Sequence, residues 1–205
     1  ARSVRVIIFS IPMEITTESI KELREATGVS VMQCKKALEE AGGDLAKATV
    51  ILKKHSAASA EKKADRSLAA GAIGSYTHDG NIGAMVLLSC ETDFVAKNPE
   101  FAALARELAM HAAATNPAYL STDEIPAEAK QAATAVFEKE VADKPAEMQA
   151  KILEGKLASY FRDQVFLEQP FIKDESKTVR SLLNEATQKF GERIEIGRFA
   201  RLSSR

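Results

Sequence analysis

The sequence predicts an α+β fold, with a small N-terminal head of three helices followed by an α+β core that holds a small antiparallel sheet and several helices. Three observations predict it. Apolar residues recur at helical spacing in three short runs across residues 15–55. Two strand-like runs, 69–77 and 82–90, flank a cluster of turn residues. Helical patterns then fill most of the remaining chain up to a last strand-like segment near its end.

Start and stop signals divide the head into its helices. Thr16 or Thr17 is suited to cap the first helix, and Gly28 ends it. Asp44 is suited to cap the third. We therefore expect residues 14–55 to form a three-helix domain, near the lower size limit for independent folding of about 40 residues.

The rest of the chain divides by composition. Residues 56–67 are small or charged, with no large apolar side chain. A segment without an apolar face to bury is expected to be a linker, either flexible or marginally helical. Residues 68–205 are then the α+β core domain. Residues 1–13 are interpreted as an extension of unknown role, with a remnant of an organelle import sequence as the alternative.

The core elements follow from the same kinds of signal. His78-Asp79-Gly80-Asn81 contains residues that tolerate positive φ, which predicts a tight hairpin between the two strand-like runs. The alternating pattern near the end of the chain predicts a further strand. The expected helices cover residues 100–115, 127–141, 146–161 and 178–190, with the second and third as a possible antiparallel pair, and the last strand covers 193–202.

Composition excludes several classes of function. The chain has 205 residues, 28 of them basic and 29 acidic, so it lacks the basic face expected of a nucleic-acid-binding protein. No apolar run approaches the ~20 residues of a membrane span. Two cysteines and three histidines do not make a disulfide framework and leave little material for a metal site. We expect no cofactor and a cytoplasmic location.

One run at a strand end stands out. Phe94 follows the acidic and polar residues Glu91, Thr92 and Asp93, just past the second strand of the hairpin, where side chains are presented rather than buried. Taken alone, Phe94 fits a cap over the core under its own loop. Its neighbours change that interpretation, because the chain carries these segments in order: Leu23-Arg24-Glu25-Ala26-Thr27-Gly28, Met32-Gln33-Cys34-Lys35-Lys36-Ala37-Leu38, Glu91-Thr92-Asp93-Phe94-Val95-Ala96-Lys97-Asn98, Ala109-Met110-His111-Ala112 and Glu168-Gln169-Pro170-Phe171.

In this order and spacing the chain resembles the bacterial elongation factor Ts family, from about Glu14 to Leu202. The resemblance implies a guanine-nucleotide exchange factor for elongation factor Tu, one that binds the GDP-bound factor, dislodges its magnesium ion and performs no covalent chemistry. It also implies that the head resembles a ubiquitin-associated domain, although a fold alone does not give a ligand.

The resemblance assigns roles to particular residues. The element that dislodges magnesium is Thr92-Asp93-Phe94-Val95, with Phe94 as the wedge, Asp93 orienting the loop, and Thr92 and Val95 anchoring its ends. The other partner contacts implied are Val31, Met32 and Lys35 in the head, Ile82 and Gly83 at the hairpin, and His111. From the residues alone, Met32 fits a core side chain equally well, and a satisfied core histidine is the default for His111.

The chain resembles the short form of the family. It has one hairpin and one set of helices, and no internal repeat is evident. A single core half suggests a homodimer that rebuilds the missing surface. The strand around Ile194-Glu195-Ile196 is a candidate edge for that pairing, or equally an internal strand covered by helices.

Two other functions remain open from the residues. One is a non-catalytic protein-binding module with a ubiquitin-associated-like head. The other is a hydrolase using Cys90, with His78 as the histidine nearest in sequence. The predicted hairpin argues against the second, because it places these two residues more than roughly 20 Å apart at opposite ends. Gly71-Ala72-Ile73-Gly74 lacks the following Lys-Ser or Lys-Thr of a phosphate loop, so we expect no nucleotide site.

Overall fold

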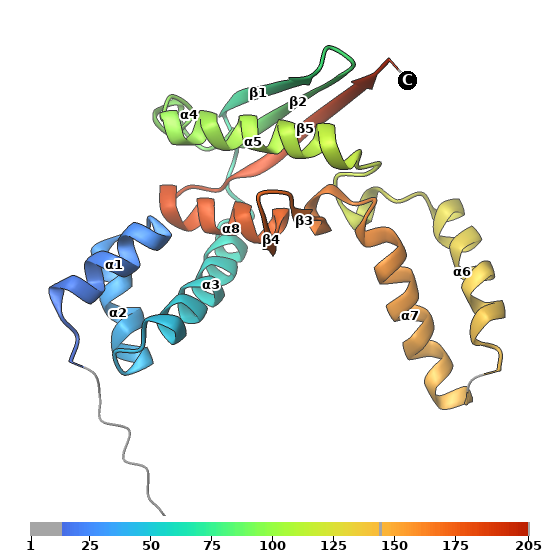
Figure 1. The fold of residues 1–205 in the computed structure, drawn as a ribbon, viewed down its shortest axis with the longest axis horizontal. Coiled ribbons are helices and arrows are strands. Elements are labelled where there is room, and N and C mark those ends of the chain that lie inside the picture. The colour runs from blue at the N-terminus through green and yellow to red at the C-terminus, as the bar shows by residue number, and fades with distance from the viewer. Residues whose placement is uncertain (1–13, 144, 205) are drawn as a thin grey trace, which may run out of the picture.

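The structure is a computed structural model that describes residues 14–143 and 145–204. It has the predicted α+β architecture (Figure 1). The predicted extension, residues 1–13, lies outside the described residues. In chain order the elements are α1 (Thr17–Thr27), α2 (Val31–Ala41), α3 (Leu45–Lys62), β1 (Ala70–His78), β2 (Ile82–Cys90), α4 (Asp93–Ala96), α5 (Pro99–Thr115), η1 (Thr122–Glu124), α6 (Ala127–Val141), α7 (Ala146–Arg162), η2 (Phe166–Glu168), β3 (Pro170–Phe171), β4 (Asp174–Thr178), α8 (Val179–Phe190) and β5 (Glu195–Ser203).

The first three helices enclose a small core of their own. Thr16 caps α1 in a capping box with Ser19, and Gly28 ends it in the left-handed conformation. Asp44 caps α3 through the backbone N–H of Lys47. The three predicted helices are confirmed, while the likeness to a ubiquitin-associated domain stays a prediction. The buried residues between them are Leu23, Val29, Cys34, Ala37, Leu38, Ala48 and Leu52.

Helix α3 continues past residue 55, through the first part of the segment predicted to be a linker. Its face there is made of small residues rather than large apolar ones. Ser56 is buried, and Ala60 lines the same cavity as Leu183 of α8. Small side chains allow two helices to approach closely, so this stretch packs without a large apolar residue. The domain boundary itself stays a prediction.

The sheet has the strand order β1-β2-β5, with antiparallel pairs throughout. The hairpin turn lies where it was predicted, with positive φ at Asp79 and Gly80. Ala70 pairs with Cys90, and His78 pairs with Ile82. Among the described residues β5 is an edge strand, yet Ile194 and Ile196 at its start are buried in the main core. Pairing of two copies through this edge stays a prediction.

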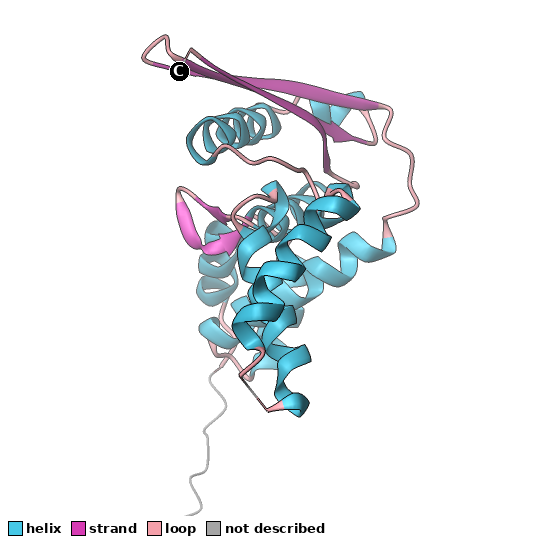
Figure 2. Ribbon diagram, turned by 90° about the vertical axis from the view of Figure 1, so that its right-hand side faces the viewer, coloured by secondary structure: helices cyan, strands magenta, loops and turns pink. Residues whose placement is uncertain are grey.

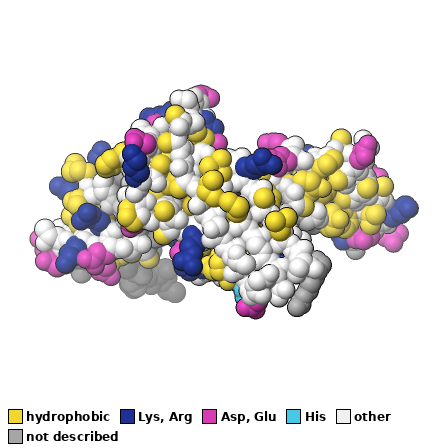
Figure 3. Space-filling view, turned by 90° about the horizontal axis from the view of Figure 1, so that it is seen from above, with side chains coloured by type: hydrophobic (Ala, Val, Ile, Leu, Met, Phe, Trp, Pro, Cys, Tyr) yellow, Lys and Arg dark blue, Asp and Glu magenta, His cyan; other side chains and the backbone are white. Residues whose placement is uncertain are grey.

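The two faces of the sheet differ. Helix α5 lies across one face, as the views in Figures 1 and 2 show. Gly74 of β1 makes this packing possible, because a Cβ added there would lie 2.1 Å from the carbonyl group of Ala105. No described helix covers the opposite face, here called the outer face (Figures 2 and 3). It carries the exposed side chains Ile73, Met85, Leu87, Ala200 and Leu202.

Helices α6 and α7 form a hairpin that projects away from the sheet (Figure 1). The predicted pair is confirmed, and an ion pair of 2.7 Å between Lys156 and Glu140 links its two arms. The short helix α4 and the small hairpin of β3 and β4 were not predicted. Both are too short for a periodic pattern, and β4 consists of Asp-Glu-Ser-Lys-Thr, with no apolar alternation.

Candidate partner-binding site

The element at the end of β2 is a single helical turn that presents one large side chain. Phe94 in α4 is 82% exposed, whereas Val95 beside it is 4% exposed and belongs to the main core. The interpretation of Phe94 as a cap over the core is therefore wrong. The turn packs against β1 and β2 through Val95, which leaves the ring of Phe94 pointing away from its own chain.

Asp93 forms an ion pair along the same turn. Its carboxylate lies 2.6 Å from the ammonium of Lys97, and both side chains are exposed. The hydrogen bond from Lys97 lowers the pKa of Asp93, and the same bond raises the pKa of Lys97. Asp93 is thus ionised near neutral pH, and a partner that binds this carboxylate must compete with Lys97.

Cys90 and Thr92 fix the base of the turn. The Cys90 thiol is buried and donates to the carbonyl oxygen of Thr92 at 3.2 Å. Burial raises the pKa of this thiol, which keeps it protonated and a poor nucleophile. His78 lies at the other end of the hairpin, as predicted. These positions argue against a hydrolase that uses Cys90.

His111 on α5 is a fully buried core residue. Its Nδ1 accepts from the backbone N–H of Ile172 at 3.3 Å, so its Nε2 carries the proton and donates to the side-chain oxygen of Gln169 at 2.9 Å. The ring stacks on Phe166. Burial lowers the pKa of His111, which keeps the ring neutral. His111 therefore does not contact a partner directly in this conformation, although it connects the Met-His segment to the Gln-Pro-Phe segment.

The hairpin residues Ile82 and Gly83 point to opposite faces of the sheet. Ile82 faces α5 and lines a cavity together with Met110 and Ile172. Gly83 lies on the outer face beside Leu202, and a Cβ added there would meet only the Tyr76 carbonyl oxygen, at 3.9 Å. Gly83 is therefore not required by packing within this chain.

The head presents Val31 and Met32 at the start of α2. Met32 is 64% exposed and Val31 is also exposed, so the interpretation of Met32 as a core side chain is wrong. Lys35, one turn further on, is paired loosely with Glu39 at 3.8 Å. The predicted site residues thus form three separate groups, on α2, on α4 and around the hairpin turn, and the last two lie at opposite ends of β1 and β2.

A set of charged residues behind α4 was missed from the sequence. The carboxylates of Glu91 and Glu192 each bond the backbone of the segment that carries the other. Because they are about a hundred positions apart, no local pattern connects them.

No group of three or more His, Cys, Asp or Glu side chains among residues 14–143 and 145–204 is arranged to hold a metal ion. Within the same residues, every helix is too short or too polar to cross a bilayer.

Comparisons with known proteins agree with one another. A sequence model of the family described as "Elongation factor TS" matches residues 14–205. Proteins named "Elongation factor Ts" from Thermodesulfovibrio yellowstonii and Thermotoga maritima are 46% and 45% identical to this chain over 190 residues, covering 92% of this chain and 96% of each relative. The protein of that name from Acetivibrio thermocellus is 46% identical over 190 residues, covering 91% of this chain and 88% of its own length.

Proposed function

The chain belongs to the elongation factor Ts family, and on this basis we propose that it is the guanine-nucleotide exchange factor of elongation factor Tu in translation elongation. It works by binding a protein, without covalent chemistry of its own. It takes no cofactor and has no nucleotide site. We also place this activity in the cytoplasm, where the elongation cycle runs.

The observation that carries the mechanism is the exposure of Phe94 on an anchored turn. Phe94 is 82% exposed while Val95 is buried, so the ring is available to a partner without unfolding of α4. Burying an aromatic ring in the partner contributes about 1.5–3 kcal/mol, enough to offset part of the strain that a wedge imposes. Magnesium demands near-ideal octahedral ligands, so a small displacement of the partner's helices weakens its binding to the GDP phosphates.

The rest of the turn supports the wedge. Asp93 orients the turn and exchanges its bond from Lys97 for one from the partner. Thr92 and Val95 hold the two ends of the turn. Because coupling between two ligands is reciprocal, GDP or GTP must weaken the binding of this protein as much as this protein weakens theirs. The complex is therefore transient, and either nucleotide completes the cycle.

The remaining proposed contacts with the partner lie on α2 in the head and around the turn between β1 and β2. Val31 and Met32 offer exposed apolar side chains at the start of α2, with Lys35 as a cation beside them. Ile82 and Gly83 make a second contact at the hairpin. His111 acts there through its neighbours, because its ring supports the backbone N–H of Ile172 beside the cavity that Ile82 lines.

We propose that two copies of the chain associate through the outer face. Apolar residues occupy the centre of that face on all three strands, and no described segment covers them. Stacking two such faces makes a β-sandwich whose core is shared between the copies. The division into a head (14–55), a linker (56–67) and a core and dimerisation domain (68–205) belongs to the same proposal.

Release of a fluorescent GDP from elongation factor Tu tests this function. The chain is expected to accelerate release strongly in the presence of magnesium. Phe94→Ala is expected to slow the accelerated rate by roughly 10- to 100-fold, the kinetic equivalent of the lost burial. Val136→Ala is the matched control, because Val136 is also an exposed apolar residue but lies on α6.

Two results would contradict the proposal at different points. If Phe94→Ala accelerates GDP release as much as the wild type does, the wedge role of Phe94 is contradicted, while the exchange activity itself is not. No acceleration by the folded wild-type chain would favour the non-catalytic binding module instead.

A further inference from the structure

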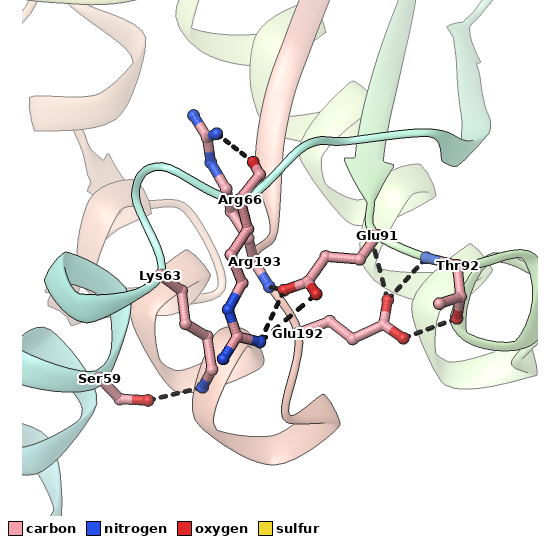
Figure 4. A network of polar contacts seen from close by, with 7 residues as sticks. All are labelled: Ser59, Lys63, Arg66, Glu91, Thr92, Glu192 and Arg193. Carbon is pink, nitrogen blue, oxygen red and sulfur yellow. Dashed lines mark hydrogen bonds and ion pairs between the residues drawn. The ribbon is translucent and has the colours of Figure 1, made fainter.

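A carboxylate from the far end of the chain lies under the start of α4 (Figure 4). One oxygen of Glu192, in the loop between α8 and β5, accepts the backbone N–H of Glu91 at 3.1 Å and that of Thr92 at 3.0 Å. Its other oxygen accepts the Thr92 hydroxyl at 2.6 Å. A single side chain thus binds three donors at the entry to the turn that carries Phe94.

The same loop is held in return by Glu91. Its carboxylate accepts the backbone N–H of Arg193 at 2.6 Å and an Arg66 guanidinium N–H at 3.2 Å. The guanidinium of Arg193 donates to the carbonyl oxygen of Arg66 (Figure 4). Three segments far apart in sequence, those around Arg66, Glu91 and Glu192, are therefore joined at one point. The bond from the Arg193 backbone lowers the pKa of Glu91, so this carboxylate is charged at neutral pH.

Helix α4 has few other constraints. It is a four-residue turn, and Thr92 at its N-cap makes no side-chain capping bond within the turn. The Thr92 hydroxyl donates to Glu192. Val95 fixes the turn on the side of the core. Without Glu192, the backbone N–H groups of Glu91 and Thr92 would lose their acceptor. The turn that carries Phe94 would then be held only by Val95 in the core, the Cys90 bond to Thr92 and the exposed Asp93–Lys97 pair.

We propose that Glu192 is a positioning residue for nucleotide exchange, which acts by holding the base of α4 so that Phe94 meets the partner in one fixed orientation. Glu91 completes this arrangement by fixing the loop that carries Glu192. The inference rests on the exchange function proposed above. Its physical basis is preorganisation. If the turn that carries Phe94 had to become ordered during binding, the entropy cost of ordering would reduce the free energy of binding.

A double-mutant cycle tests this route of action. Glu192→Ala is expected to lower the GDP-release rate at saturating protein by about tenfold, the usual scale for lost hydrogen bonds to a charged group. The half-saturating concentration is expected to change less, because the contacts on α2 remain. In the Phe94→Ala background the same substitution is expected to add little, since Glu192 acts through that ring.

Glu128→Ala is the control for loss of a carboxylate, because Glu128 is exposed on α6, distant from α4 (Figure 1). It is expected to release GDP at the wild-type rate. Thr92→Val is the milder variant if Glu192→Ala folds poorly, since it removes only the hydroxyl donor and keeps the shape of the side chain. It is expected to slow release in the same direction by a smaller factor.

Hydrogen exchange of the free protein gives a readout that does not depend on the partner. Amides of residues 91–97 are expected to exchange faster in Glu192→Ala, with the thermal unfolding temperature little changed. If these amides are as protected in Glu192→Ala as in the wild type, the positioning role is overturned. A GDP-release rate of Glu192→Ala equal to that of the wild type overturns it as well. The positioning role is also overturned if Glu192→Ala lowers the GDP-release rate by the same factor in the wild type and in the Phe94→Ala background. If the wild-type chain does not accelerate GDP release, the exchange function fails, and the inference about exchange fails with it.

Discussion

At the scale of single residues, adjacent positions in α4 have opposite environments. Phe94 is exposed and Val95 is buried, although both are apolar. The difference comes from the direction of each side chain on one helical turn, with one side on the sheet and the other in solvent. The free energy of burying an exposed aromatic ring is gained only when a partner covers it. The Phe94 ring therefore contributes to binding rather than to folding.

The buried His111 gives a pH prediction at the same scale. Burial lowers its pKa in the folded chain, so the unfolded chain takes up a proton at a higher pH, near the ordinary value of about 6.5. Stability from the neutral ring is complete above that pH and is lost as the pH falls toward the folded-state pKa. Between pH 7 and about 5, the free energy of unfolding is expected to fall with a slope of at most ~1.4 kcal/mol per pH unit from this residue.

Urea unfolding of the wild type and His111→Gln at several pH values measures this contribution. Carboxylates titrate in both proteins, so the difference between the two slopes isolates His111. The variant is expected to be less stable at pH 7 and less sensitive to acid. Parallel curves for the two proteins would show that His111 does not titrate with unfolding.

At the scale of elements, the contact of α5 with β1 depends on Gly74. A Cβ at this position would lie 2.1 Å from backbone atoms of Ala105, which no rotamer change relieves. Gly74→Ala is expected to force α5 away from the sheet and lower the free energy of unfolding by about 1–3 kcal/mol or more, the usual effect of overpacking. Denaturant unfolding measures the loss.

The same sheet offers a matched control. Gly83→Ala introduces the same methyl group on β2, where a Cβ would lie 3.9 Å from the Tyr76 carbonyl oxygen, so the stability of this variant is expected to stay close to wild type. Equal stability of the two variants would contradict the close packing of α5 on β1. Because Gly83 is also a proposed partner contact, slower GDP release by this folded variant would support that role.

At the scale of the whole molecule, the outer face is an apolar surface that no described segment of the chain covers. Ile73, Met85 and Leu87 are exposed on adjacent strands, where an isolated chain gains nothing from them. Leu87→Glu is expected to separate the proposed dimer, because two copies would then bury facing carboxylates. Sedimentation equilibrium measures the change.

Val50→Glu serves as the control, since Val50 is an exposed apolar residue of α3 in the head. It is expected to keep the mass of the wild type. A wild-type chain that sediments as a monomer at micromolar concentration would rule out a stable dimer through this face.

Local signals allowed much of the fold and part of the site to be predicted. Capping residues such as Thr16 and Asp44 act on amides three positions away, and the Asp79-Gly80 turn fixes the register of its own hairpin. These causes lie within a few residues of their effects. The α+β class, the main helices and the prominence of the segment around Phe94 were therefore visible in the sequence.

Tertiary structure decided what depends on residues far apart. The packing of small residues extended α3 through part of the predicted linker. Helix α5 covers only one face of the sheet, so the outer face stays exposed. Packing also made Met32 an exposed residue and His111 a buried one. The support of α4 by Glu192 joins segments about a hundred residues apart, and no sequence period specifies such a contact. Those outcomes follow from which surfaces meet once the chain has folded, because burial and long-range hydrogen bonds are properties of the whole arrangement.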